Sequence, residues 1–131
     1  MITEDYVSFN TAKLLKEKGF DDEYTNAFYD KNGNLYFIDI LSDFSEHSDN
    51  DTDIAASTLY VAMKWLREVH NLFIFISTWL RHKDGTVQYY YEIRNLNDKD
   101  FETIAESTIT EFDSPEKTCE AAIKYCLENL I

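Results

Sequence analysis

Hydrophobic and polar residues recur along this chain with two different periods, and the longer period predicts three amphipathic helices. In residues 114–130, Ser114 suits the N-cap and Pro115 the first helical position. A short helix is predicted over residues 8–19, with Ser8 as its cap and Gly19 as its stop. A further helix is predicted over residues 54–70, with Asn71 as its stop. The apolar stripes comprise Phe9, Ala12 and Leu15; Ile54, Thr58, Val61, Ala62, Trp65, Leu66 and Val69; and Cys119, Ala122, Ile123, Cys126, Leu127 and Leu130.

Five other segments have the composition or the two-residue period of β-strands. Residues 24–30 and 35–40 flank Asn32 and Gly33, a pair that favours a type I′ turn. Residues 72–80 and 86–94 flank a turn that contains Asp84 and Gly85. A further strand is predicted within residues 102–112, which are rich in threonine and isoleucine. The sequence therefore predicts two β-hairpins, the second extended by one strand.

The predicted elements follow the order αββ and then αβββα. No internal repeat and no linker rich in proline, glycine or serine divides them. We therefore expect one α+β domain over residues 1–131, with an antiparallel sheet and about three helices.

The strand predicted over residues 72–80 is apolar on both faces. Side chains alternate along a strand, so Leu72, Ile74, Ile76 and Leu80 share one face, and Phe73, Phe75 and Trp79 share the other. In the next strand Tyr90 belongs to the second set. Either the first helix and its hairpin cover this second face, or another protein does. The candidate interface residues are thus Phe73, Phe75, Trp79 and Tyr90.

Charge separates this chain from most nucleic-acid-binding proteins. It has 25 acidic and 12 basic residues, a net charge of −13, and 44% hydrophobic residues with nine Phe and nine Tyr. The aromatic content disfavours disorder, and the negative charge disfavours binding to nucleic acid and to acidic membranes. Residues 42–53 contain five carboxylates without a basic residue, which predicts a solvated loop.

A calcium site is the first candidate chemistry, because Asp49, Asp51 and Asp53 have the spacing of a calcium-binding loop. Such a loop requires glycine next and glutamate at its twelfth position, where Ile54 and Tyr60 stand. We therefore expect no specific metal.

Catalytic groups are also missing from the sequence pattern. His47, His70 and His82 are not spaced as metal ligands, and Cys119 and Cys126 lie on an apolar stripe. The three glycines form neither a nucleophile elbow nor a phosphate loop. The sequence therefore indicates no catalytic residue and no cofactor.

The compartment is inferred from two features. No basic-then-apolar leader opens the sequence, and the longest apolar run is far shorter than the roughly 20 residues of a membrane span. The two cysteines, seven residues apart in one predicted helix, are too distant to form an intrachain disulfide. We expect a cytoplasmic protein.

The order αβββα over residues 54–130 resembles the double-stranded-RNA-binding domain. That family places consecutive lysines at the start of its last helix to contact phosphates. Here Glu116 and Glu120 flank the single Lys117. The resemblance therefore concerns topology, and RNA binding is not expected.

A second resemblance concerns the residues of two predicted helices. In these segments the chain resembles small uncharacterised proteins encoded by gut bacteria of the Bacteroides group and by their phages and mobile elements. The resemblance implies a habitat and no chemistry. It rests on Ala62, Met63, Lys64, Trp65, Leu66, Arg67, Glu68, Val69 and His70, and on Cys119, Glu120, Ala121, Ala122, Ile123, Lys124, Tyr125, Cys126, Leu127, Glu128, Asn129 and Leu130.

Three functions follow from these observations. The first is a non-enzymatic acidic accessory or interaction protein that binds a protein partner or a second copy of itself. The second is an acidic mimic of nucleic acid that inhibits a DNA- or RNA-handling enzyme. The third is a small enzyme whose site is assembled from residues scattered in the sequence.

Overall fold

The computed structural model describes residues 2–38, 52–80, 84–108 and 111–131. The predicted α+β class is confirmed: these described residues form three α-helices and two three-stranded antiparallel sheets. The chain divides into two compact units, Met1–Thr58 and Leu59–Ile131, here called the N-terminal and C-terminal units. The prediction of a single domain over residues 1–131 stays a prediction.

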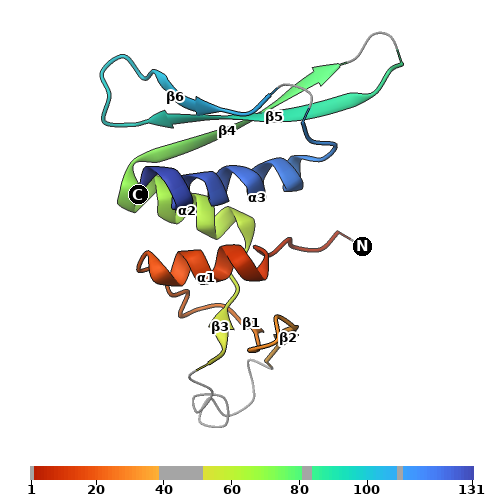
Figure 1. Ribbon diagram of the computed structural model, residues 1–131, viewed down its shortest axis with the longest axis vertical. Helices are drawn as coiled ribbons and strands as arrows, with labels where there is room; N and C mark the ends of the chain where they lie inside the picture. The colour runs from red at the N-terminus through yellow and green to blue at the C-terminus, as the bar shows by residue number, and fades with distance from the viewer. Residues whose placement is uncertain (1, 39–51, 81–83, 109–110) are drawn as a thin grey trace. The chain divides into compact units, whose positions relative to one another are not determined.

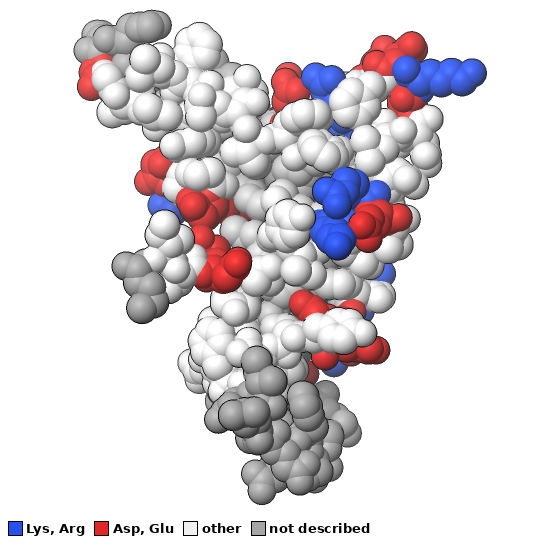
Figure 2. Space-filling view, turned by 180° about the vertical axis from the view of Figure 1, so that it is seen from behind, with Lys and Arg blue, Asp and Glu red and all other residues white. Residues whose placement is uncertain are grey.

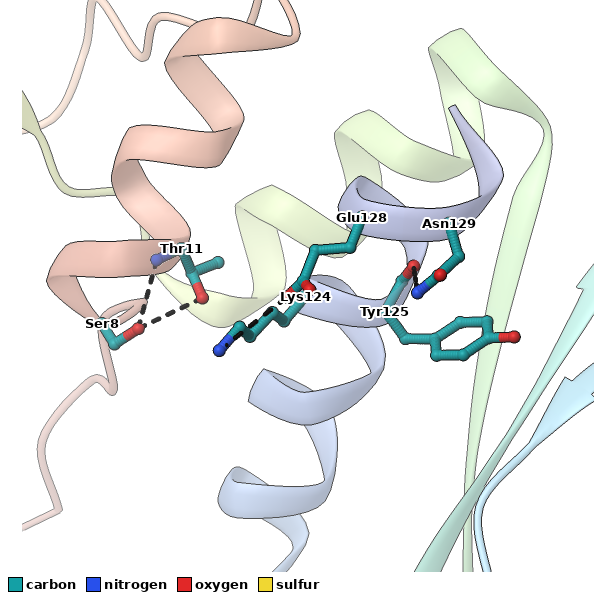
Figure 3. Close-up of polar contacts among 6 residues, drawn as sticks. All are labelled: Ser8, Thr11, Lys124, Tyr125, Glu128 and Asn129. Carbon is teal, nitrogen blue, oxygen red and sulfur yellow. Dashed lines mark hydrogen bonds and ion pairs between the residues drawn. The ribbon is translucent and has the colours of Figure 1, made fainter.

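The N-terminal unit begins with helix α1, Phe9–Glu17. Ser8 is its N-cap, and the Ser8 hydroxyl accepts a hydrogen bond from the Thr11 backbone N–H (Figure 3). Beyond its end, Gly19 has a φ of 96°, which glycine adopts without strain. The predicted cap and stop are therefore confirmed.

A small sheet of strand order β2-β1-β3 completes this unit (Figure 1). Strands β1, Ala27–Tyr29, and β2, Leu35–Phe37, form the predicted hairpin. The type I′ turn was wrong, because only Gly33 has a positive φ, 82°, whereas Asn32 does not. The Asp30 carboxylate accepts hydrogen bonds from the backbone N–H groups of Asn32 and Asn34. This side chain holds the longer turn that the structure has instead.

The third strand of this sheet corrects the predicted start of the second helix. Ile54 and Ala55 form strand β3, Ile54–Ala55, opposite Tyr29 and Phe28. Their backbone belongs to the sheet, so helix α2 begins only at Leu59 and runs to His70. Its buried positions are Leu59, Ala62 and Leu66, whereas Val69 of the predicted stripe is 56% exposed.

The C-terminal unit contains the elements α2, β4, β5, β6 and α3 in the predicted order αβββα. Strands β4, Leu72–Leu80, and β5, Val87–Asn95, form a long hairpin, and β6, Thr103–Glu106, pairs with β5. Asn71 has a φ of 59°, so the predicted helix stop is confirmed. Figure 1 shows that α2 and α3 lie on the same side of this sheet.

Helix α3, Pro115–Tyr125, continues as a π-helical turn, Cys126–Leu130. The Ser114 hydroxyl accepts a hydrogen bond from the Lys117 backbone N–H, as predicted for the N-cap. In the last turn the Asn129 amide donates to the Tyr125 carbonyl oxygen, and Lys124 pairs with Glu128 at 3.8 Å (Figure 3). The π-helical turn was not predicted, since the apolar spacing of Cys126 and Leu127 is equally compatible with an α-helix.

Several sequence predictions fall outside the described residues. They are most of the acidic loop 42–53, the histidines His47 and His82, and Ile109 and Thr110 of the fifth predicted strand. Among the described residues, no helix has the length and apolar composition to cross a membrane.

Candidate functional site

The C-terminal sheet has two faces of different character, as the alternation in β4 predicts. The register pairs Phe75 with Glu92, Ser77 with Tyr90 and Trp79 with Gln88, so these residues share one face. We call it the aromatic face: Phe73, Phe75, Trp79, Tyr90 and their same-face neighbours. The opposite face, the helix face, carries Leu72, Ile74, Ile76, Tyr91 and Ile93.

The helix face is the core of this unit. Ile93 is fully buried, and Tyr91 and Leu72 are buried nearly as completely. Helices α2 and α3 and the π-helical turn after α3 supply the other side of the core with Ala62, Leu66, Cys119, Ala122, Ile123, Cys126 and Leu127. One face of the predicted strand is thus covered within its own unit.

The aromatic face has no such cover within the described part of this unit, because both helices lie on the other side (Figure 1). Trp79 is 46% exposed, and Phe73, Phe75 and Tyr90 are half-buried. The rings of Phe73 and Phe75 pack 4.7 Å apart. The four candidate interface residues therefore share one partly exposed surface, and their role as an interface stays a prediction.

Two residues that the sequence did not single out complete this surface. The Arg94 guanidinium lies 5.1 Å from the ring centroids of both Phe75 and Phe101. It also donates to the Phe101 carbonyl oxygen at 3.3 Å and pairs with Glu92 at 3.2 Å. Arg94 is thereby held next to two aromatic rings that also contact one another, with centroids 6.0 Å apart, and its guanidinium has a carbonyl oxygen and a carboxylate as polar partners.

The sequence could have placed Arg94 on the aromatic face, but nothing in it places Phe101 there. The hairpin turn at Asp84 and Gly85 sets the register that places Arg94 opposite Phe73, so strand counting alone finds it. Phe101, however, reaches the aromatic face from a turn in which its own φ is 51°, an uncommon value for an aromatic residue. Local propensity does not predict such a conformation.

A small cavity adjoins the aromatic face. Its volume is about 200 Å³, and its lining includes Tyr60, Lys64 and Arg67 of α2 together with Phe73 of β4. The cationic side chains at its rim are exposed or half-buried. Leu72 and Ile74 of the helix face also line the cavity, so it lies between α2 and the start of β4, beside Phe73.

The cysteines have the properties of core residues. Cys119 and Cys126 are buried and unpaired with one another, and burial raises the pKa of each thiol to about 12. A thiol with so high a pKa is almost fully protonated at neutral pH and is a poor nucleophile.

In the N-terminal unit the most perturbed group is Tyr36. Burial, followed by a hydrogen bond that its hydroxyl donates to the Asp53 carboxylate, raises the pKa of Tyr36 to about 12. Asp53, predicted to be a solvated loop residue, is thus half-buried and engaged by Tyr36. The other two residues of the calcium-like spacing, Asp49 and Asp51, lie outside the described residues.

Metal-ligating side chains do not gather in the part of the chain that the structure describes: no three His, Cys, Asp or Glu residues are placed to hold one ion. His70, at the end of α2, packs edge-on against Trp65 with ring centroids 4.7 Å apart. It is the last residue of α2 and therefore lies at the negative end of the helix.

The negative charge is unevenly divided between the two units. Residues 1–58 contain 13 acidic and 4 basic residues, a net charge of −9, whereas residues 59–131 contain 12 and 8, a net charge of −4. On the side shown in Figure 2, Lys and Arg side chains lie next to Asp and Glu. Such mixed charge does not make a phosphate-binding surface on that side.

Comparison with protein-family models, curated proteins and solved structures finds no significant match to this chain. Its function is therefore argued from its own residues.

Proposed function

We propose that this chain is a non-enzymatic interaction protein that binds a protein partner through its aromatic face. The observation that carries the proposal is the contrast between the two faces of one sheet. Two helices bury Leu72, Tyr91 and Ile93 of the helix face, whereas no residue of β4 or β5 on the aromatic face is buried, and Trp79 is 46% exposed. Apolar surface of this kind is typical of sites where another protein binds.

The composition of the aromatic face supports this proposal. Trp, Tyr, Phe and Arg are enriched in the centres of protein interfaces, and Trp79, Tyr90 and Arg94 are of the types that dominate binding energy. Arg94 is preorganised by Phe75 and Phe101, so little side-chain entropy is lost when a partner contacts it. The inert thiols and the phenol of Tyr36 give no comparable support for an enzyme.

The resemblance to small proteins of gut Bacteroides-group bacteria and their mobile elements suggests where such a partner occurs. We propose an accessory role in that setting, inside the cell. A lysate of such a bacterium is accordingly the material in which to search for the partner.

The proposal is tested by affinity capture with three forms of the tagged chain: wild type, Trp79→Ser and the control Tyr24→Ser. Tyr24→Ser also replaces an exposed aromatic residue by serine, since Tyr24 is 96% exposed. Tyr24 lies in the N-terminal unit and is not part of the aromatic face. We expect a protein, or an untagged second copy, to be retained by the wild type and Tyr24→Ser and lost with Trp79→Ser.

Equal recovery with all three forms contradicts the role of the aromatic face. Circular dichroism of Trp79→Ser is needed alongside, because a variant that unfolds would show that Trp79 belongs to a core.

A second function, an acidic mimic of nucleic acid, is favoured by the net charge of −9 over residues 1–58. A partner bound through this charge is a basic, nucleic-acid-handling enzyme, and its capture weakens steeply as salt rises. Capture of a partner by the aromatic face is much less sensitive to salt, because its binding free energy comes from burial of apolar surface and not from charge. Repeating the capture at low and high salt therefore separates the two functions.

A further inference from the structure

The two edges of the C-terminal sheet differ in how well they are protected against another strand. Strand β6 is short, has a bulge opposite Ile93 and Arg94, and ends at the exposed Glu106. Short length, bulges and charges are the usual means by which proteins block pairing at a sheet edge. Strand β4, at the opposite edge, has nine residues and no charge, proline or bulge.

Backbone hydrogen bonds show which groups of β4 point outward. The Leu96 N–H donates to the Asn71 carbonyl oxygen at 2.8 Å, so odd-numbered residues of β4 direct their backbone groups toward β5. Tyr89, opposite Thr78, donates to Phe112 on the far side of β5, in agreement with this assignment. The outward-directed N–H and C=O groups are therefore those of Leu72, Ile74, Ile76, Thr78 and Leu80, and no described strand pairs with them.

We propose that this edge binds β4 of a second copy of the chain, in antiparallel orientation, and joins the two sheets into one. The inference rests on the proposed function and names the partner and the way it binds. With Ile76 opposite Ile76 of the second copy, Ile74 faces Thr78 and Leu72 faces Leu80. All of these have outward-directed backbone groups, so every pair exchanges hydrogen bonds around a two-fold axis.

The same register also matches side chains. On the aromatic face it places Phe73 opposite Trp79 and Phe75 opposite Ser77 of the second copy, because paired residues share a face. Trp79 and Leu80, which are 46% and 49% exposed in one chain, acquire apolar neighbours in this way. The two aromatic faces become one continuous surface.

Charge favours a second copy at this position. Residues 69–80 form the longest stretch of the sequence without Asp, Glu, Lys or Arg. Two chains of net charge −13 repel one another over most of their surface, and pairing through β4 brings together the segments that carry no charge.

The test uses Thr78, because its side chain is exposed and its N–H points outward. In Thr78→Pro the missing N–H and the added ring block pairing at the edge, whereas no hydrogen bond to β5 is lost. Thr78→Ala keeps the N–H and is the matched control. Sedimentation equilibrium is expected to give twice the 15.4 kDa chain mass for wild type and Thr78→Ala. For Thr78→Pro we expect a dimer dissociation constant at least about tenfold higher.

Hydrogen exchange of the β4 amides identifies the surface that the dimer uses. Edge pairing protects the amides of Leu72, Ile74, Ile76, Thr78 and Leu80 in the wild type. In Thr78→Pro, which has no amide at position 78, the amides of Leu72, Ile74, Ile76 and Leu80 exchange fast. The amides of Phe73, Phe75, Ser77 and Trp79 are protected in both, because they bond to β5. If Thr78→Pro does not fold, Thr78→Lys, which places the usual protective charge at the edge, replaces it.

The outcomes separate this inference from the proposed function. A wild type that stays monomeric overturns the inference, while the capture experiment with Trp79→Ser still decides the proposed function. A dimer that Thr78→Pro leaves intact, with unprotected even-numbered amides, also overturns it. If Trp79→Ser dissociates that dimer, the copies meet through the aromatic face.

Discussion

The two faces of the C-terminal sheet are built from the same strands, yet only one of them is the core of its unit. On the helix face, Ile93 is fully buried beneath two helices. One residue along the strand, on the aromatic face, Arg94 lies partly exposed beside two phenylalanine rings. A strand with two apolar faces is therefore expected to be covered on both sides. The apolar pattern does not say whether the same chain or another molecule covers each side.

The largest expected effect is on the alkylation rate of the two cysteines that are buried in the core against the helix face. At pH 8, alkylation of Cys119 and Cys126 by iodoacetamide should be about 1,000-fold slower in the folded protein than in urea. Their pKa is raised from 9.0 to about 12, which lowers the thiolate fraction by that factor. Mass spectrometry over time measures both rates, and fast alkylation in buffer would show that α3 does not cover this face.

The same pKa values predict how stability depends on pH. The folded thiols hold their protons above pH 9, where the unfolded thiols lose theirs. The stabilisation is therefore fully present below about pH 9 and is lost as the pH rises toward about 12. Urea unfolding at a series of pH values measures this decrease, and unchanged stability across that range would contradict the burial of the thiols.

The next largest effect is expected from a substitution that creates a cavity beneath the sheet. Ile93→Ala removes part of a fully buried side chain and should lower the free energy of unfolding by about 3 kcal/mol. Val87→Ala is the control, because Val87 lies on the same strand and the same face but is 44% exposed. Urea unfolding should give less than about 1 kcal/mol for the control, and equal losses would mean that the two positions are equally buried.

A smaller effect is expected from the arginine of the aromatic face. Arg94→Lys keeps the charge but loses the guanidinium contact with Phe75 and Phe101, and should lower the free energy of unfolding by about 1 kcal/mol. Arg67→Lys, at a residue paired with Glu68 only at 3.9 Å, should change it by less than about 0.5 kcal/mol. A loss at Arg94 no greater than at Arg67 would show that the contact of Arg94 with the two rings does not stabilise the fold.

The smallest effect on folding is expected at Trp79. Trp79→Ser should change the free energy of unfolding by less than about 1 kcal/mol, since almost half of this residue is already exposed. Partner binding should nonetheless be lost. A decrease of several kcal/mol in urea would instead assign Trp79 to a core.

Much of the fold was predictable because its signals are local. The caps Ser8 and Ser114 and the stop at Asn71 act within a few residues, and the structure has each of them. The long hairpin was equally predictable, since the Asp84-Gly85 turn and the alternation of side chains along β4 and β5 specify its strands.

The wrong predictions concern residues whose conformation depends on contacts with residues outside the local sequence pattern. Ile54 and Ala55 fit a helical stripe, but pairing with Phe28 and Tyr29 makes them a strand. At the first hairpin the Asp30 carboxylate, and not the Asn32-Gly33 pair alone, determines the turn. Propensity is a weak signal at such positions, and tertiary contacts override it.

The sequence by itself determined that β4 has two apolar faces, because alternation follows from strand geometry alone. It also determined the charge of −13 and the types of most elements. Only the tertiary structure decided that α2 and α3 share one face, and that Phe101 reaches Arg94 from a turn. Packing and long-range pairing depend on residues far apart in the chain, and no local pattern encodes which of two apolar faces a helix will cover.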